Sequence, residues 1–505
     1  MEKMSILALD QGTTSSRAIL FDQGATILGE YSVALTQHYP KPGWVEHDPV
    51  EILNSQVAAM RKAVADSGDA GAVLDRIQCV GIANQRETVL LWNRVTGKPL
   101  ANAIVWQCRR TADLCAKLTE SGWTEKIRHK TGLVVDAYFS GTKIKWMLDH
   151  IPEARALADA GKLLAGTVDS WLIWNLTEEQ RHVTDYSNAS RTMLFNIHEL
   201  CWDAELLELL DIPASIMPEV VPSSGVVGTL KQEVLGRRVP ISGIAGDQQA
   251  ALFGQNCFLP GSAKCTYGTG CFLLMNTGNQ PVFSSNNLLT TIAWGIGDDV
   301  AYALEGSVFH AGSVIRWLQR GLGLIDKPEQ VDIDSQNVVD NGGLYVVPAL
   351  TGIGAPYWDP FAGGLMIGIT GGTKREHISR AVLESIAYQC TDIFSLMAED
   401  SGIPVREVLV DGGVSVSDFL MQFQADMTGV LINRPRIKET TALGAAELAG
   451  LGVGIWKDKQ ELIQIRQSEA VFKPIIARGE RDKLYRCWKK AVERSLAWGE
   501  SGIGR

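Results

Sequence analysis

The sequence predicts an α/β protein with two domains of comparable size, and three observations support this prediction. A chain of 505 residues is too long for a single hydrophobic core. Apolar runs typical of strands alternate with segments of helical spacing, which indicates an α/β architecture. A pattern of two apolar runs around a Gly/Thr turn also occurs twice, as though one α/β unit had been duplicated. We expect domains at residues 1–255 and 256–505.

The N-terminal elements begin with the first of these hairpin patterns. Apolar runs at residues 5–10 and 17–22 flank a turn rich in glycine and hydroxyl residues, which predicts a β-hairpin. A helix is expected over residues 50–67, where apolar residues recur at roughly helical spacing. Strands are expected at residues 77–83 and 88–93.

The pattern starts again near residue 240. A strand is expected over residues 240–245, followed by a polar loop at 246–249 and a helix that starts at Gln249. Residues 263–275 contain the second hairpin pattern. A last helix over residues 481–498 is amphipathic, which is typical of a helix that packs on a domain. Its expected buried face carries Leu484, Trp488, Ala491 and Ser495.

The composition argues against several classes of protein. The formal net charge is −10 and no run of Lys and Arg supplies a basic patch, so nucleic-acid binding is not expected. Nine cysteines without CxxC pairs favour reduced thiols in a cytoplasmic protein. No apolar stretch reaches the roughly 18 residues that a membrane helix requires. Asp10 interrupts the first apolar run, so no signal peptide is expected either.

The first candidate site is the hairpin turn at residues 10–17. Backbone N–H groups and hydroxyl side chains in such a turn suit a polyanion such as a phosphate chain. Asp10, at the end of the first strand, is a candidate ligand for Mg²⁺, and Arg17 would offset phosphate charge. The alternative is a plain hairpin with polar turn residues. The P-loop, dinucleotide and protein-kinase motifs are all missing from the sequence.

A second candidate is Asp247, a carboxylate beside a glycine at the end of an expected strand. Phosphoryl transfer to an alcohol requires a group that orients and deprotonates the hydroxyl, and Asp247 is placed for this role. The alternative is an N-cap on the helix that follows.

Two shorter segments complete the candidates. Arg86 and Glu87 could donate to and accept from a polyol, or they could form a solvated surface pair. The turn after the expected strand at 409–411 contains Gly412 and Gly413, whose bare backbone would let a base and ribose lie close. An empty turn is the alternative there.

Together and in this order, these segments resemble the carbohydrate-kinase family that includes glycerol, xylulose, ribulose and gluconate kinases. The resemblance covers residues 5 to about 460. It is carried by residues 10–17, 85–88, 138–146, 244–249, 267–270 and 411–413. Residues 10–17, 85–88 and 243–254 are similar to the members that phosphorylate glycerol.

The resemblance implies two actin-like (ribonuclease H-like) domains that close over ATP–Mg²⁺ and an alcohol, here glycerol. It implies that Asp247 is the general base and that Asp10 and Asp247 are metal ligands. The implied polyol-binding residues are Arg86, Glu87, Trp106, Tyr138, Asp247, Gln248 and Phe272. The implied residues around ATP are Thr13, Thr14, Ser15, Arg17, Thr269, Gly312, Ile315, Arg316, Gly413 and Ser417.

The resemblance also concerns assembly and regulation. Homodimers or homotetramers are expected, and Gly236 and Arg238 resemble a loop that binds fructose 1,6-bisphosphate in some members. The alternative for that loop is an exposed basic turn. Arg316 and Ser417 depart from the Gln and Asn that many members have, which affects the nucleotide side only. The alternative functions are a kinase of another polyol or ketopentose, and a non-catalytic actin-like nucleotide switch.

Overall fold

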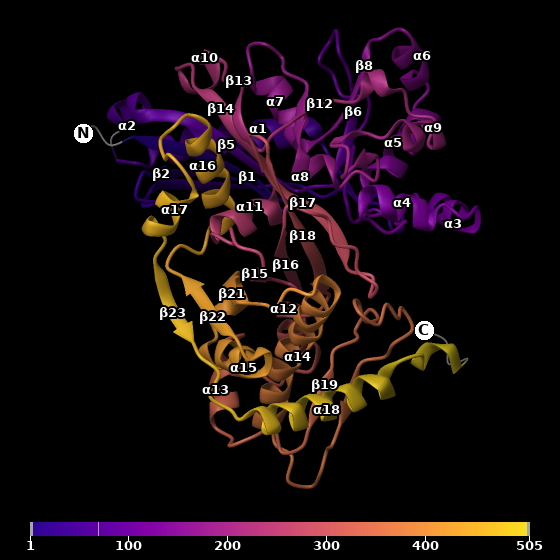
Figure 1. Cartoon of the computed structure of the whole chain (residues 1–505), viewed down its shortest axis with the longest axis vertical. Coiled ribbons are helices and arrows are strands. Elements are labelled where there is room, and N and C mark those ends of the chain that lie inside the picture. Colours follow the sequence, from indigo (N-terminus) through magenta and orange to yellow (C-terminus); the bar gives the residue numbers. More distant parts are fainter. Residues whose placement is uncertain (1–3, 69, 502–505) are drawn as a thin grey trace.

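The architecture is given by a computed structural model, which describes residues 4–68 and 70–501. Thirteen strands in this part of the chain form one mixed sheet, in the order β23-β22-β21-β15-β16-β18-β17-β13-β14-β5-β1-β2-β3. Figure 1 shows the sheet running from the indigo N-terminal strands to the yellow β23, with helices on its faces. The predicted α/β class is confirmed.

The strands of the N-terminal half lie at one end of this sheet. They are β1 (Ser5–Gln11), β2 (Ser15–Asp22), β3 (Ile27–Ala34), β5 (Ile77–Asn84), β13 (Ser224–Thr229) and β14 (Pro240–Gly246). The remaining strands are β15 (Ser262–Tyr267), β16 (Cys271–Gly278), β17 (Leu289–Ile296), β18 (Asp299–Val308), β21 (Glu407–Asp411), β22 (Leu431–Pro435) and β23 (Ser468–Phe472).

The two predicted hairpins occupy equivalent places in the two halves. Strand β1 pairs antiparallel with β2 and parallel with β5. Strand β15 pairs antiparallel with β16 and parallel with β21. The repeated hairpin pattern in the sequence therefore corresponds to a repeated local arrangement of strands.

Three parallel strands end together at the edge where the first hairpin turns. Strand β5 lies between β1 and β14 and runs parallel to both. Asn84 at the end of β5 is opposite Gln11 on one side and Gly246 on the other. The residues next to these ends, Asp10 and Asp247 among them, are consequently brought to one place. The carboxyl ends of parallel strands are the usual location of ligand sites in α/β sheets.

Helices cover the sheet on its apolar surfaces. The predicted helix at 50–67 is α1 (Pro49–Ala65), whose N-terminal N–H of Val50 is capped by Asp48. The last helix is α18 (Arg478–Ser495), which starts three residues earlier than predicted and buries Trp488, Ala491 and Ser495. Other helices that carry the argument are α5 (Ser140–His150), α8 (Tyr186–Ala189), α11 (Asp247–Gly254), α14 (Arg375–Ser401), α15 (Asp418–Thr428) and α16 (Thr440–Gly452).

Two local predictions require correction. Residues 247–249 belong to helix α11 and not to a polar loop, and the helix begins at Asp247 instead of Gln249. The strand expected from residue 88 is β6 (Val89–Asn93), which lies in a separate four-stranded sheet with β4 (Glu46–His47), β7 (Ala103–Ile104) and β8 (Leu163–Thr167). No described helix is both long and apolar enough to span a bilayer.

The two halves of the large sheet join through few contacts between strands. Strands β13 and β17 pair in parallel through Ser224 and Ile296. The N–H of Ser223 also donates to the carbonyl oxygen of Gly295 at 2.8 Å. Helix α16, from the C-terminal half of the sequence, packs on β1, β5 and β14 of the N-terminal half. Because α16 crosses from one half to the other, the strand contacts alone do not fix a domain boundary, and we keep the boundary between residues 255 and 256 as a proposal.

Helices α11 and α16 cross at a distance that only glycine permits. A Cβ built at Gly444 of α16 would lie 1.8 Å from the carbonyl oxygen of Ala250. A Cβ at Gly254 would lie 2.2 Å from the carbonyl oxygen of Thr440. Because α11 begins with Asp247, this crossing also fixes the helix that carries the candidate base.

We predict that Gly444→Ala destabilises the protein by about 3 kcal/mol, since the added methyl group meets backbone atoms that cannot move aside. Gly479→Ala is the matched control, because Gly479 lies in helix α18 and, apart from its own helix and chain neighbours, no atom of the described residues lies within 4 Å of the built Cβ. The control should change stability by less than about 1 kcal/mol. Thermal unfolding of both variants measures the difference, and equal unfolding temperatures would contradict this account of the crossing.

Candidate functional site

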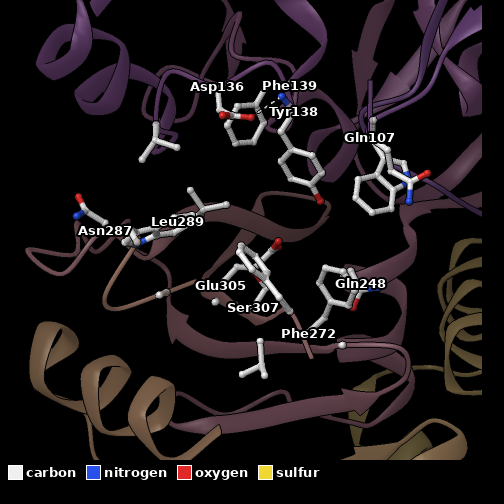
Figure 2. A pocket seen from close by; sticks show the side chains of 18 of the residues that line it. Gln107, Asp136, Tyr138, Phe139, Gln248, Phe272, Asn287, Leu289, Glu305 and Ser307 are labelled. Carbon is white, nitrogen blue, oxygen red and sulfur yellow. Dashed lines mark hydrogen bonds between the residues drawn. The ribbon is translucent and has the colours of Figure 1, made fainter. Parts of the chain in front are cut away.

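A cleft of about 1010 Å³ lies where residues of the two halves of the chain face each other. The predicted site residues Trp106, Tyr138, Gln248, Thr269 and Phe272 all line it. Figure 2 shows Tyr138 projecting into the cavity from one side, with Gln248 and Phe272 on the other. The structure therefore brings these five residues together around one space.

The first hairpin turn lies next to this cleft. The Gly12 N–H donates to the carbonyl oxygen of Ser15 at 2.9 Å, which closes the turn, while Thr14 is exposed. The indole Nε1 of Trp106 donates to Thr13 Oγ1 at 2.9 Å. Because Trp106 also lines the cleft, this hydrogen bond ties the turn to the wall of the cavity.

The charge of Asp247 affects the ionisation of Asp10. Burial and the charge of Asp247 raise the pKa of Asp10 to about 7, and Arg17 opposes this rise. Two neighbouring carboxylates that repel each other favour a divalent cation between them. Oxygen ligands of this type suit Mg²⁺, so the donor set fits the expected metal.

Asp247 is the first residue of helix α11, and Gly246 is the N-cap. The alternative role of Asp247 as a helix cap is therefore wrong. Its Oδ1 accepts from the N–H of Gln248 at 2.7 Å and lies 3.5 Å from Nε of Arg86. Burial raises the pKa of Asp247, Arg86 lowers it and the charge of Glu87 raises it further.

Arg86 and Glu87 are buried, with only 2% and 1% of their surfaces exposed. The alternative of a solvated surface pair is therefore wrong. Arg86 donates to both oxygens of Glu305, at 2.5 and 2.9 Å. Glu87 Oε1 accepts from Nε of Arg191 at 2.8 Å. Burial disfavours the ionised form of Glu305, but Arg191 and Arg86 lower its pKa to about 2.

Several of these partners are absent from the residues predicted from the sequence. Arg191 follows helix α8, Glu305 lies in β18, and Lys264 lies in β15. Lys264 donates to Gln248 Oε1 and, at 3.0 Å, to Thr266 Oγ1, and its burial lowers its pKa. A single charge inside an apolar strand, as at Glu305 and Lys264, was the signal that could have identified them.

The side walls of the cleft are aromatic. The rings of Trp106 and Tyr138 meet edge to face, with centroids 5.5 Å apart. The Tyr138 hydroxyl accepts from Nη2 of Arg86 at 3.3 Å, so the ring carries its polar atom to the charged residues. Phe272, from β16, supplies an apolar surface on the other side.

The second hairpin turn contacts helix α12 (Gly312–Arg316). The Gly312 N–H donates to the carbonyl oxygen of Gly268 at 2.9 Å, and a Cβ at Gly312 would lie 2.7 Å from that oxygen. Nη2 of Arg316 donates to Thr269 Oγ1 at 2.8 Å. Three of the residues expected near ATP are thus neighbours. Ile315 differs, because it is almost fully buried in the hydrophobic core.

Gly413 and Ser417 lie in the turn between β21 and α15. Gly412 has a φ of 88°, and Gly413 is exposed with open space around its built Cβ. The Oγ of Ser417 caps α15 by accepting from the N–H of Leu420 at 3.0 Å, and it donates to Asp332. A Cβ at Gly312 would lie 3.2 Å from Val414, so this turn adjoins α12.

Three further predicted residues lie in other surroundings. Arg17 forms an ion pair with Glu439, the residue before helix α16. Gly236 ends helix α10 (Gln232–Leu235) with a φ of 81°, and Arg238 donates to Glu178 at 2.8 Å with 64% of its side chain exposed. Neither Gly236 nor Arg238 is among the described residues that line the cleft.

Comparison with known proteins identifies the family. The chain matches the N-terminal domain of the FGGY family of carbohydrate kinases over residues 5–254, and the C-terminal domain over residues 263–453. It is 57% identical to glycerol kinase 2 of Thermotoga maritima over 98% of this chain and 99% of that protein. It is 56% identical to the glycerol kinase of Caldanaerobacter subterraneus subsp. tengcongensis, with the same coverage.

Solved structures agree with this assignment. The structure of Plasmodium falciparum glycerol kinase with ADP matches with a TM-score of 0.93 and 38% identity, over 98% of both chains. Gluconate kinase from Lactobacillus acidophilus has the same fold, with a TM-score of 0.87 over 99% of both chains at 22% identity. The predicted two-domain kinase fold is confirmed, and the chain belongs to the FGGY family of carbohydrate kinases.

Proposed function

We propose that the protein transfers the γ-phosphoryl group of ATP to glycerol, which gives sn-glycerol 3-phosphate. The observation that carries this proposal is the contact of buried Arg86 with buried Glu87 and with half-buried Asp247, next to the aromatic wall of Trp106 and Tyr138. Relatives that are 55–57% identical over nearly the whole chain are named glycerol kinase.

The chemistry of the cluster suits a small polyol. Glycerol has three hydroxyls and little apolar surface, so its affinity must come from several paired hydrogen bonds. Arg86 donates, Glu87 and Asp247 accept, and Gln248 can do both. A wrong substrate that leaves one of these buried groups unpaired costs about 1–3 kcal/mol. Trp106, Tyr138 and Phe272 would contact the carbon backbone.

Asp247 would accept the proton of the attacking hydroxyl. Its raised pKa makes it a stronger base than an exposed carboxylate. Asp10 and Asp247 would hold Mg²⁺, which when bound neutralises charge on the phosphate oxygens. Burial and the charge of Asp247 raise the pKa of Asp10, and a cation at this place would offset both effects.

The two hairpin turns would hold the phosphate chain from opposite sides. Thr13, Thr14, Ser15 and Arg17 would bind phosphate from the first turn, and Thr269 and Arg316 from the second. Gly312, Ile315, Gly413 and Ser417 would border the rest of the nucleotide. Closure of domains 1–255 and 256–505 would then exclude water, which competes with glycerol as the acceptor.

We predict that glycerol has the highest kcat/KM in a panel that also contains xylulose, ribulose, erythritol and gluconate, with ATP and Mg²⁺ in every assay. The cleft of about 1010 Å³ is larger than glycerol requires, so the panel must include the larger sugars. Formation of the phosphate ester is the readout. A higher kcat/KM for another polyol would make that polyol the substrate. ATP hydrolysis independent of any polyol, together with polymerisation, would favour a nucleotide switch.

We predict that Asp247→Asn lowers kcat by roughly 10²–10⁴ while glycerol still binds, because the amide keeps the shape but cannot accept the proton. Asp299→Asn is the control, since Asp299 is 59% exposed and pairs with Lys459 at the start of β18. Its kcat should stay that of the wild type. Full kcat in Asp247→Asn would remove this residue from the role of base.

We also propose a cytoplasmic homodimer or homotetramer that fructose 1,6-bisphosphate inhibits at Gly236 and Arg238. Arg238→Ala should abolish inhibition by this effector, because an exposed guanidinium is the expected phosphate donor. Arg478→Ala, which removes an arginine that is 84% exposed elsewhere, should leave inhibition intact. Initial rates measured against effector concentration decide the matter. Unchanged inhibition in Arg238→Ala would exclude this loop.

A further inference from the structure

We propose that Arg191 and Glu305 are positioning residues that fix the two polyol-binding side chains, Arg86 and Glu87. These four residues form a closed ring of alternating charges, which we name the charge ring. The proposal rests on the proposed function, because it concerns how the alcohol substrate is held.

The ring closes through four contacts. Arg86 lies 3.5 Å from Glu87, measured from Nε to Oε1. Glu87 Oε1 accepts from Arg191 Nε at 2.8 Å, and Arg191 Nη2 donates to Glu305 Oε1 at 3.1 Å. Glu305 returns to Arg86 through two hydrogen bonds of 2.5 and 2.9 Å. Each charge therefore has an opposite charge on both sides.

Burial of the four charged side chains of the ring carries an unfavourable desolvation free energy, which suggests a role beyond stability. Its four side chains are at most 3% exposed. Well-packed apolar residues are often as stabilising as such an arrangement, or more so. Arg191 Nη1 has in addition no hydrogen-bond partner within residues 4–68 and 70–501, although the guanidinium lies against the rings of Tyr138 and Phe139. Stability alone does not account for this choice of residues.

The ring fixes the guanidinium of Arg86 against two residues that line the cleft, Glu305 and Tyr138. The two bonds to Glu305 fix the plane of the guanidinium, because a bidentate pair permits little rotation. The contacts of Arg86 with Tyr138 Oη, at 3.3 Å, and Asp247 Oδ1, at 3.5 Å, are longer. These weaker contacts identify the N–H groups that a polyol hydroxyl can take over. Glu305 and Tyr138 both line the cavity, as Figure 2 shows.

The ring also connects distant parts of the chain. Arg86 and Glu87 lie between β5 and β6, Arg191 follows α8, and Glu305 belongs to β18 in the other half of the sequence. A strand of the C-terminal half thereby controls the orientation of the polyol-binding residues of the N-terminal half.

The test compares glycerol KM and ATP KM in Glu305→Gln. The glutamine keeps the shape, but its amide group faces a guanidinium donor and breaks the bidentate pair. Glycerol KM should rise at least tenfold, while ATP KM stays within twofold of the wild type. The matched control is Glu384→Gln, since Glu384 is 3% exposed and pairs with Arg380 within helix α14, outside the residues that line the cleft. The control should leave both KM values within twofold.

Two more variants separate positioning from stability. Arg191→Lys keeps the charge but cannot bridge two carboxylates in the same way, and it should raise glycerol KM at least threefold. The double variant Arg191→Gln/Glu305→Gln restores the net charge of the ring to zero. Its unfolding temperature should therefore be higher than that of Glu305→Gln, while its glycerol KM stays as high. Recovery of both together would overturn the proposal, as would a glycerol KM within twofold of the wild type in Glu305→Gln.

Failure of the proposed function gives a different result. If the wild-type protein prefers another polyol, glycerol is the wrong substrate, and KM is compared for the preferred polyol in the same variants. A selective rise in that KM still supports the charge ring, and an unchanged KM still overturns it.

Discussion

Strands β1, β5 and β14 run parallel and end at one level of the sheet, and the positions of Asp10, Arg86, Glu87 and Asp247 depend on this alignment. Asp10 lies at the end of β1, Arg86 and Glu87 follow β5, and Asp247 follows β14. The register of the three strands brings two carboxylates and an Arg–Glu pair together. A shift of one residue in the pairing of β1 would turn Asp10 to the other face of the sheet.

Burial gives these groups their chemical properties. Water screens charges poorly in such a place, so Asp247 affects the ionisation of Asp10, and Arg191 and Arg86 keep Glu305 ionised. The same burial makes each unpaired polar group unfavourable. The site is therefore suited to a ligand that supplies hydroxyls, a divalent cation and phosphate, which together can satisfy all of these groups.

The parts of the fold that depend on local sequence could be predicted. Both hairpins, helix α1 and helix α18 follow from apolar periodicity and turn residues, and the boundaries differ by only a few positions. The motif residues Trp106, Tyr138, Gln248 and Phe272 could be placed in one cleft through the family resemblance. The first residue of α11 could not be predicted, because the polar residues 247–249 are as typical of a loop as of a helix.

The partners that could not be predicted from the sequence pair over long distances along the chain. Arg191 and Glu305 are 104 and 219 residues from their partners Glu87 and Arg86, and no short motif contains both members of either pair. The burial of Arg86 and Glu87 could not be predicted for the same reason. Two adjacent residues of opposite charge are typical of a protein surface, and only the assembled strands show that this pair is buried. Glu439, which pairs with Arg17 from the start of α16, is another example.

A crystal structure with glycerol, Mg²⁺ and a non-hydrolysable ATP analogue tests the central claim most directly. The account predicts that glycerol binds at the ends of β5 and β14, with its hydroxyls within hydrogen-bond distance of Arg86, Glu87 and Asp247. It also predicts that Arg86 keeps its two bonds to Glu305 in the complex. Glycerol bound elsewhere in the cleft, or an Arg86 that leaves Glu305 to reach it, would contradict the account.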